Sequence, residues 1–163
     1  MLLRRRQWPG IAAAVAFGLA AGLGVFTFGY AKGSSYLTND PAACANCHVM
    51  SEHFAAWQRG SHRTAATCND CHTPHNVAGK YATKALNGFW HSFYFTTGGY
   101  PDPLRITPRN RDVTERACRY CHAEIVDAID ARTTGSTRSA GTDHGQPGLS
   151  CVRCHAYAGH WVR

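Results

Sequence analysis

All eight cysteines of this 163-residue chain lie in four copies of a Cys-x-x-Cys-His pentapeptide. This is the attachment signal of c-type haem, in which two thiols bond to the porphyrin and the next histidine offers an imidazole to the iron. Zinc sites, disulfides and thioredoxin-type redox pairs also use cysteine pairs, but none of them needs a histidine directly after every second cysteine. We therefore predict four covalently bound haem c groups. Their attachment and proximal residues are Cys44, Cys47, His48, Cys68, Cys71, His72, Cys118, Cys121, His122, Cys151, Cys154 and His155.

Six further histidines are available for the distal iron positions. A haem that only transfers electrons usually has two axial side chains, and their identity sets its potential. His62 lies just before the second motif, and His144 lies in a long segment with no other iron-binding residue type. His53 and His75 fit the alternative of an ordinary polar residue better. The residues predicted as distal ligands are His62, His91, His144 and His160.

Met50 extends the first motif to Cys-x-x-Cys-His-x-Met, and the only other methionine is Met1. A thioether ligand would raise the potential of the first haem relative to a haem with two imidazoles. Met50 either replaces His48 on one face of this haem, or reaches the opposite face, or is a buried thioether in a small core. The spacing leaves these alternatives open, so His48 and Met50 are both predicted as candidate ligands of the first iron.

An uncharged run precedes the motifs and extends from Trp8 to Ala31. Its apolar part, residues 11–30, is about 20 residues long and spans roughly 30 Å as a helix, the thickness of a bilayer core. A cleaved signal peptide usually has a shorter apolar region and a small-residue cleavage site. We predict a cytoplasmic tip and a transmembrane anchor in residues 1–31, and a tetrahaem cytochrome c domain in residues 32–163. Three arginines before the anchor place the N-terminus in the cytoplasm, so the haem domain lies in the periplasm, outside the inner membrane.

The polar part, about 130 residues, would bury only a modest core by itself. Four porphyrins change this because each is a large apolar body that the chain can wrap. Sixteen glycines and seven prolines fit a loop-rich wrapping. We predict a mainly α fold with many loops, consisting of one transmembrane helix and a small multihaem domain. The formal charge is +7, but no basic run or motif indicates nucleic acid.

Local signals predict short elements around the motifs. Residues 40–41, Asp-Pro, are typical of an N-cap and a first helical position. Residues 51–59 and 112–129 read as helices, the second of them around the third motif. Residues 98–103 are rich in Gly and Pro and interrupt any element. Residues 131–148 are predicted to form a loop.

These residues together resemble a known family, the membrane-anchored tetrahaem quinol dehydrogenases of the NapC/NirT/NrfH type. The resemblance covers nearly the whole chain and is greatest to members that serve cytochrome c nitrite reductases. The extended first motif is its most discriminating part. The residues that carry it are Ser34 to Leu37, Cys44 to Met50, Trp57, Gly60 to His62, Cys68 to His75, Lys84, Asn87 to His91, Cys118 to His122, Asp143 and His144.

The resemblance implies that the chain oxidises menaquinol at the membrane surface and passes electrons to a periplasmic pentahaem nitrite reductase that forms ammonia. It implies that Met50 is an axial ligand of the first haem. It also implies that one haem takes its distal ligand from the partner, which would leave one candidate histidine free. The alternatives are a quinol dehydrogenase or a passive electron wire that feeds a nitrate or N-oxide reductase.

In this family a lysine and an acidic residue lie beside the quinol. Lys84 matches the lysine, and His91 stands at the acidic position. Quinol oxidation releases two protons, and Lys84 can accept one only with a lowered pKa, whereas a histidine titrates near neutrality. Lys84 and His91 are therefore the predicted catalytic residues. The aromatic run 89–95 is predicted to line the quinol slot or, alternatively, to pack against a haem or the membrane surface.

Overall fold

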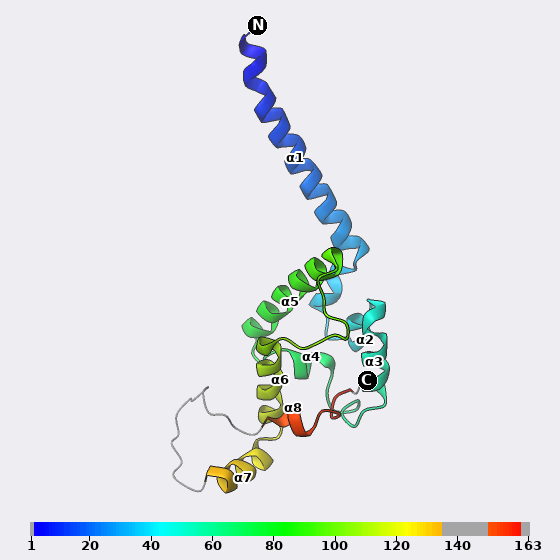
Figure 1. Ribbon diagram of the computed structural model, residues 1–163, viewed down its shortest axis with the longest axis vertical. Helices are drawn as coiled ribbons and strands as arrows, with labels where there is room; N and C mark the ends of the chain where they lie inside the picture. The colour runs from blue at the N-terminus through cyan, green and yellow to red at the C-terminus, as the bar shows by residue number, and fades with distance from the viewer. Residues whose placement is uncertain (1, 135–149, 161–163) are drawn as a thin grey trace.

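The computed structural model describes residues 2–134 and 150–160. Every regular element in these two ranges is a helix, which confirms the predicted fold class. The long helix α1 stands apart as a rod, and the other elements gather at its C-terminal end (Figure 1). The elements are α1 (Leu2–Tyr30), η1 (Gly33–Leu37), α2 (Pro41–Cys44), η2 (His48–Met50), α3 (Ser51–Gln58), α4 (Cys68–His72), α5 (Val77–Thr97), α6 (Pro108–Cys121), α7 (Ala123–Thr134) and α8 (Cys151–Cys154).

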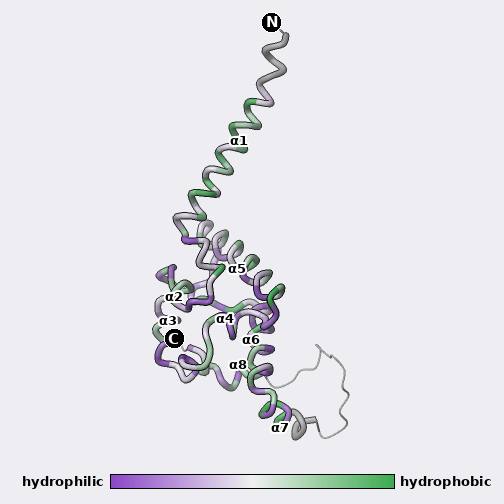
Figure 2. Tube along the Cα trace, turned by 180° about the vertical axis from the view of Figure 1, so that it is seen from behind, coloured by the Kyte–Doolittle hydropathy of each residue, from purple (hydrophilic) through white to green (hydrophobic). Residues whose placement is uncertain are grey.

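Helix α1 carries the predicted membrane segment. Its part from Trp8 to Tyr30 is 23 residues long, has a mean hydropathy of 2.1 and is 0% buried against the rest of the protein. Figure 2 shows this apolar character along most of the rod. The length is sufficient to cross a hydrocarbon core of about 30 Å. Because an exposed run of apolar side chains is unfavourable in water, the helix is stable as a rod only in an apolar surrounding.

The short helix η1 joins α1 to the motif-bearing domain. Lys32 adopts φ 50°, in the left-handed region that few side chains occupy, and it separates the two helices. The ring of Tyr36 on η1 then packs over α5, where a Cβ at Gly88 would lie 3.4 Å from it. This contact places the end of α1 beside α5.

Helices α5 and α6 form the framework of the domain. Gly98 ends α5 with φ 71°, a conformation that glycine adopts without strain. The amide of Asn110 on α6 donates to the side-chain oxygen of Asn87 on α5 at 3.2 Å. The Arg109 guanidinium donates to the Thr83 hydroxyl, also at 3.2 Å. These bonds hold the two helices together although they are separated by an irregular segment.

The predicted helix over 112–129 is wrong in one respect, because it is two helices. The third proximal histidine, His122, takes φ −110° and ψ 30°, which ends α6 before α7 begins. The predicted loop over 131–148 also begins later, since α7 continues to Thr134. The remainder of that predicted loop, from residue 135, lies outside the described residues.

The described residues contain almost no apolar core. Ala117 is the one hydrophobic residue among them that is buried. The other buried residues are polar, namely Asn69, Thr73, Thr83 and Lys84. A helical domain held together by side-chain packing normally buries most of its large apolar side chains. The interior of this domain therefore needs additional apolar bodies, as expected of a chain that wraps porphyrins.

Candidate functional site

The haem motifs lie on short helices. In the second, third and fourth motifs both cysteines belong to one helix, namely α4, α6 and α8. Residues three apart on a helix lie on one face, so each pair of thiols is presented to a single porphyrin edge. The first motif differs, because α2 ends at Cys44 and Cys47 follows the next turn. The predicted N-cap of α2 is confirmed: the Asp40 carboxylate accepts from the N–H of Ala42 at 2.9 Å.

Thiols of successive motifs lie close together. Cys44 of the first motif and Cys68 of the second share a hydrogen bond, which lowers the pKa of Cys44 to about 7 and raises that of Cys68. Burial and then the nearby charge of Cys71 raise the pKa of Cys118, so the second motif also adjoins the third. The motifs are thus neighbours in space in the order in which they follow one another along the chain.

Glu115 connects the fourth motif to the third. Its carboxylate accepts from the N–H of Cys151 at 2.8 Å, from the N–H of Val152 at 3.3 Å and from the Ser150 hydroxyl. Burial and then this carboxylate raise the pKa of Cys151 to about 11. Because Glu115 lies on α6 and the three donors begin α8, the carboxylate fixes the position of the last haem motif against the third.

Two of the predicted distal histidines lie against proximal histidines. The His62 ring centroid is 6.0 Å from that of His122, and the His160 centroid is 6.0 Å from that of His72. Two imidazoles that share one metal through bonds of about 2 Å are separated by a similar distance. In addition, the Ala158 carbonyl accepts from His62 Nδ1–H at 2.8 Å, which leaves Nε2 free for a metal.

The chemistry of these histidines fits haem iron. His53 Nδ1 is buried without a hydrogen-bond partner, and its ring centroid is 5.1 Å from that of His160. Burial and then the charge of His160 lower the pKa of His72 to about 4. The His72 ring is therefore neutral at pH 7, and the neutral imidazole is the form that binds metal. The unpaired His53 Nδ1 is a buried polar atom that contact with a bound cofactor could satisfy.

The remaining predicted ligands are less constrained. His48 and His155 are exposed, and Met50 is half-buried at the end of η2. Which of His48 and Met50 binds the first iron stays a prediction. His144 lies outside the described residues.

Lys84 is buried beside the first motif. Its ammonium donates to the Thr38 carbonyl at 2.5 Å and to Asn39 Oδ1 at 3.3 Å. Burial and then the charge of Lys80 lower its pKa, which is the direction that a proton acceptor requires. Proximity to Lys84 also helps to lower the pKa of Cys44, so this ammonium lies near the attachment point of the first haem.

His91 has a partner that sequence reasoning missed. The hydroxyl of Tyr36 lies 3.2 Å from His91 Nδ1, across 55 residues of sequence. Burial and then the charges of Cys47 and Cys44 raise the pKa of Tyr36, so this pair also adjoins the first motif. Partial burial lowers the pKa of His91. Tyr36 belongs to the stretch that carries the family resemblance, but no local pattern in the sequence connects it with His91.

The aromatic run on α5 does not form one surface with Lys84. At 3.6 residues per turn, Lys84, Gly88 and His91 lie along one side of the helix, and Phe89 and Phe93 lie along the opposite side. On that outer side, a shallow groove of about 400 Å³ is lined by Phe89, Ser92, Phe93, Thr96 and Thr97. The predicted quinol slot therefore does not contain Phe89 and Phe93 together with both catalytic candidates.

One membrane-length helix followed by a thin helical wrapping with four haem-attachment motifs defines a single-pass, membrane-anchored multihaem cytochrome c. The sequence model of the NapC/NirT cytochrome c family, N-terminal region, matches residues 6–163. The chain belongs to this family, which confirms the resemblance inferred from its motifs.

Relatives of known identity cover most of the chain. The chain is 35% identical over 147 residues to the cytochrome c-type protein NrfH of Wolinella succinogenes. This alignment covers 90% of the chain and 82% of that protein. It is 30% identical over 103 residues to the cytochrome c nitrite reductase subunit NrfH of Nitratidesulfovibrio vulgaris, over 63% of this chain and 64% of that subunit.

A solved structure has the same fold. It is the crystal structure of the cytochrome c nitrite reductase NrfHA complex bound to the HQNO inhibitor, matched with a TM-score of 0.58. The alignment covers 87% of each chain at 24% sequence identity. At this identity the likeness supports the arrangement of the anchor and the small helical domain.

Proposed function

We propose that this chain is a tetrahaem quinol dehydrogenase that oxidises menaquinol and passes the electrons to a periplasmic pentahaem cytochrome c nitrite reductase, which forms ammonia. The observation that carries the proposal is the cluster around the first haem motif. There Lys84 and the Tyr36–His91 pair lie next to Cys44, and η1 places this group at the end of the membrane helix. The similarity to two proteins named NrfH, one of them a nitrite reductase subunit, supports the identity of the acceptor.

The four motifs would hold the haems through their eight cysteines, with His72, His122 and His155 as proximal ligands and His48 or Met50 at the first iron. Bound haem c groups would each carry one electron, so a two-electron donor can be oxidised in two one-electron steps. The spatial order of the motifs, supported by the contacts of Cys44 with Cys68 and of Cys71 with Cys118, suits transfer away from the membrane.

The chain's own residues would manage the protons. With His91 Nδ1–H donating to the Tyr36 oxygen, Nε2 is free to accept a proton from a quinol hydroxyl. The lowered pKa of His91 keeps this ring neutral near pH 7. The electrons leave one at a time, so His91 would accept the two protons in turn and release each to bulk water before the next transfer. Lys84 would orient the quinol, since its ammonium is already positioned by Thr38 and Asn39. In this role His91 is a catalytic residue and not an iron ligand.

We further propose the orientation of the chain. The arginines at the start of α1 favour a cytoplasmic N-terminus, and the haem domain then lies in the periplasm beside the inner membrane. This arrangement brings the first motif within reach of a quinol in the bilayer and exposes the later motifs to a periplasmic partner.

The test is to add a menaquinol analogue to the purified, fully haem-loaded protein and to monitor haem reduction through the haem absorbance. We expect complete reduction by the quinol and reoxidation on addition of the nitrite reductase with nitrite. If chemical reductants reduce the haems but the menaquinol analogue does not, the protein is a passive electron wire and the proposed quinol oxidation is refuted. A protein that is reoxidised only by a nitrate or N-oxide reductase would refute the proposed acceptor.

A further inference from the structure

The outer side of α5 carries a continuous apolar surface, which we call the α5 outer face. It consists of Leu86, Phe89, Trp90, Phe93 and Tyr94. These positions follow the i, i+3, i+4, i+7, i+8 spacing of a single helix face. All five side chains are exposed, with Phe89 62% and Phe93 46% accessible. A soluble surface rarely leaves so many large apolar side chains together.

The aromatic rings of this face contact one another. Trp90 stacks on Tyr94 with ring centroids 5.3 Å apart, and Phe89 stacks on Phe93 at 6.4 Å. Trp90 and Phe93 meet edge to face at 5.8 Å, which joins the two pairs. These contacts join the four rings into one continuous aromatic surface.

Charge is absent from this part of the chain. No Asp, Glu, Lys or Arg occurs from Ala85 to Pro101. The segment combines aromatic residues with Ser, Thr and Gly. Trp and Tyr are enriched where a bilayer meets water, because their rings are apolar and their polar atoms remain hydrated. A protein interface of ordinary size would also have a polar, charged rim, and residues 85–101 supply no charge to one.

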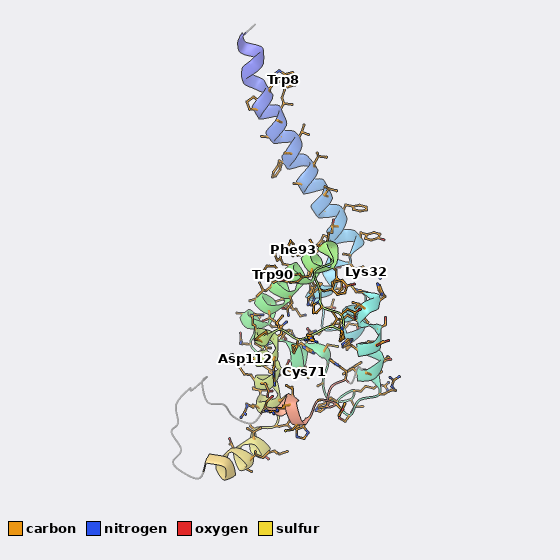
Figure 3. All side chains as sticks on the ribbon, in the orientation of Figure 1. Trp8, Lys32, Cys71, Trp90, Phe93 and Asp112 are labelled. Carbon is orange, nitrogen blue, oxygen red and sulfur yellow. The ribbon has the colours of Figure 1, made fainter. Side chains whose placement is uncertain are left out.

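The position of the face identifies what covers it. The C-terminal end of α5 lies beside the lower end of α1 in both ribbon and tube views (Figures 1 and 2). Trp90 and Phe93 lie on the part of α5 nearest to the end of the anchor and at a level similar to Lys32 (Figure 3). Lys32 is the first charged residue after the apolar span, which ends at Tyr30, so the edge of the bilayer is expected near it. At this level an exposed apolar surface would be placed to contact lipid.

We propose that the α5 outer face is a second membrane contact, in which the C-terminal half of α5 lies in the interfacial region of the bilayer beside α1. Amphipathic helices bind membranes in this way, with the apolar face in the region between headgroups and acyl chains. The contact fixes the rotation of the haem domain about the anchor. It thereby keeps the opposite side of α5, with Lys84 and His91, turned towards the first haem motif. This proposal is independent of the reaction that the protein catalyses.

The test uses the full-length haem-loaded protein in lipid nanodiscs that contain a phospholipid with a diazirine on its acyl chain. After irradiation, mass spectrometry maps the lipid adducts. We expect adducts on α1 and on α5, with more at Phe93 and Tyr94 than at Leu86, and none on α6. Adducts confined to α1 would overturn the proposal.

A matched pair of variants separates the face from exposed apolar residues in general. The double variant Phe89→Gln/Phe93→Gln should reduce adducts on α5 severalfold and leave those on α1 unchanged. The control Val77→Gln/Ile125→Gln changes two residues that are 73% and 59% accessible, and it should leave the adduct map unchanged. Equal labelling of α5 in the double variant and the wild type would count against the assignment.

The competing occupant is the periplasmic partner. The labelling is therefore repeated with the purified nitrite reductase bound. Adducts that persist on α5 support a lipid contact, and adducts that disappear from α5 while remaining on α1 assign the face to the partner and refute the proposal. Haem absorbance of each preparation reports folding, and the wild-type map decides the question even if the double variant fails to assemble.

Discussion

Lys84 is the only charged side chain among the buried residues in the described ranges, and a buried ammonium is costly unless it is hydrogen-bonded. Thr38 and Asn39 supply two acceptors, which fix its position next to the first motif. The chain thus maintains a lysine of lowered pKa where the fold would be easier to assemble with an apolar residue. Such a feature is typical of a functional site.

The first prediction concerns this lysine. Lys84→Gln should lower the rate of quinol-dependent haem reduction by roughly 100-fold, an effect that loss of substrate positioning can produce. Reduction by dithionite should remain complete. The exposed Arg105→Gln serves as a control for the loss of one positive charge and should retain the wild-type rate. A Lys84→Gln protein that oxidises quinol normally would remove the lysine from the site.

The second prediction concerns pH. A catalytic base must be unprotonated, and burial lowers the pKa of His91 from its ordinary value of 6.5. The rate of quinol oxidation should therefore be constant near neutrality and fall only below pH 6.5, as His91 becomes protonated. His91→Gln should lower the rate and abolish this acid limb.

The same variant tests the other role predicted for His91. An iron ligand, when replaced, changes the haem absorption spectrum and the potential, whereas a base does not. We expect the spectrum of His91→Gln to match that of the wild type. A spectral change with an unaltered pH profile would make His91 a distal ligand.

At the scale of elements, the short helices that carry the motifs are held by side chains of longer helices. Helix α8 has only one turn, and helices this short are not stable by themselves. The Glu115 carboxylate of α6 satisfies the N–H groups of Cys151 and Val152, as an N-cap would. The last haem motif is therefore positioned from outside its own helix.

Glu115→Ala should destabilise the holoprotein by about 1–2 kcal/mol, the usual cost of a lost cap. Urea unfolding at pH 7 measures this. Burial acts to raise the pKa of Glu115, but the bonds from Ser150, Cys151 and Val152 outweigh it and lower the pKa below 4.5. The stabilisation is thus present above pH 4.5 and is lost as the pH falls through the lowered pKa. Glu124→Ala on α7 is the control, and equal destabilisation by it would argue against a specific cap.

The elements also show where sequence patterns suffice. The Asp-Pro start of α2 acts through the Asp40 carboxylate and the glycine that ends α5 through its own backbone, and both were predictable because these effects are local. The break at His122 was not, because no glycine or proline marks it and only the backbone turn after the third motif interrupts the helix.

At the scale of the molecule, the domain has almost no protein core of its own. With Ala117 as the single buried apolar residue in the described ranges, side-chain burial alone cannot offset the entropy of ordering the chain. We therefore expect the haems to contribute most of the apolar burial and folding to depend on their attachment.

This dependence can be measured. The variant Cys118→Ala/Cys121→Ala, which prevents attachment of the third haem, should fail to give a protease-resistant domain even though both replacements are small. Arg116→Ala removes only an exposed ion pair with Asp112 and should leave protease resistance unchanged. A stable domain without the third haem would show that the protein core is larger than the described residues indicate.

The sequence by itself determined the cofactor chemistry, the anchor and the fold class. Covalent haem attachment depends on residues within five positions of one another, and a membrane helix depends on a continuous apolar run, so both signals are local. Lys84 and His91 were chosen as catalytic residues through the family resemblance, and their roles stay predictions.

Only the tertiary structure decided how these parts meet. The Tyr36–His91 bond, the bonds of Lys84 to the segment before α2 and the contact of Cys44 with Cys68 join residues far apart in the sequence. The aromatic run 89–95 could be placed in a slot, on a haem or on the membrane until the rotation of α5 turned Phe89 and Phe93 outward. Such contacts depend on how helices pack, and no local pattern of residue types encodes that packing.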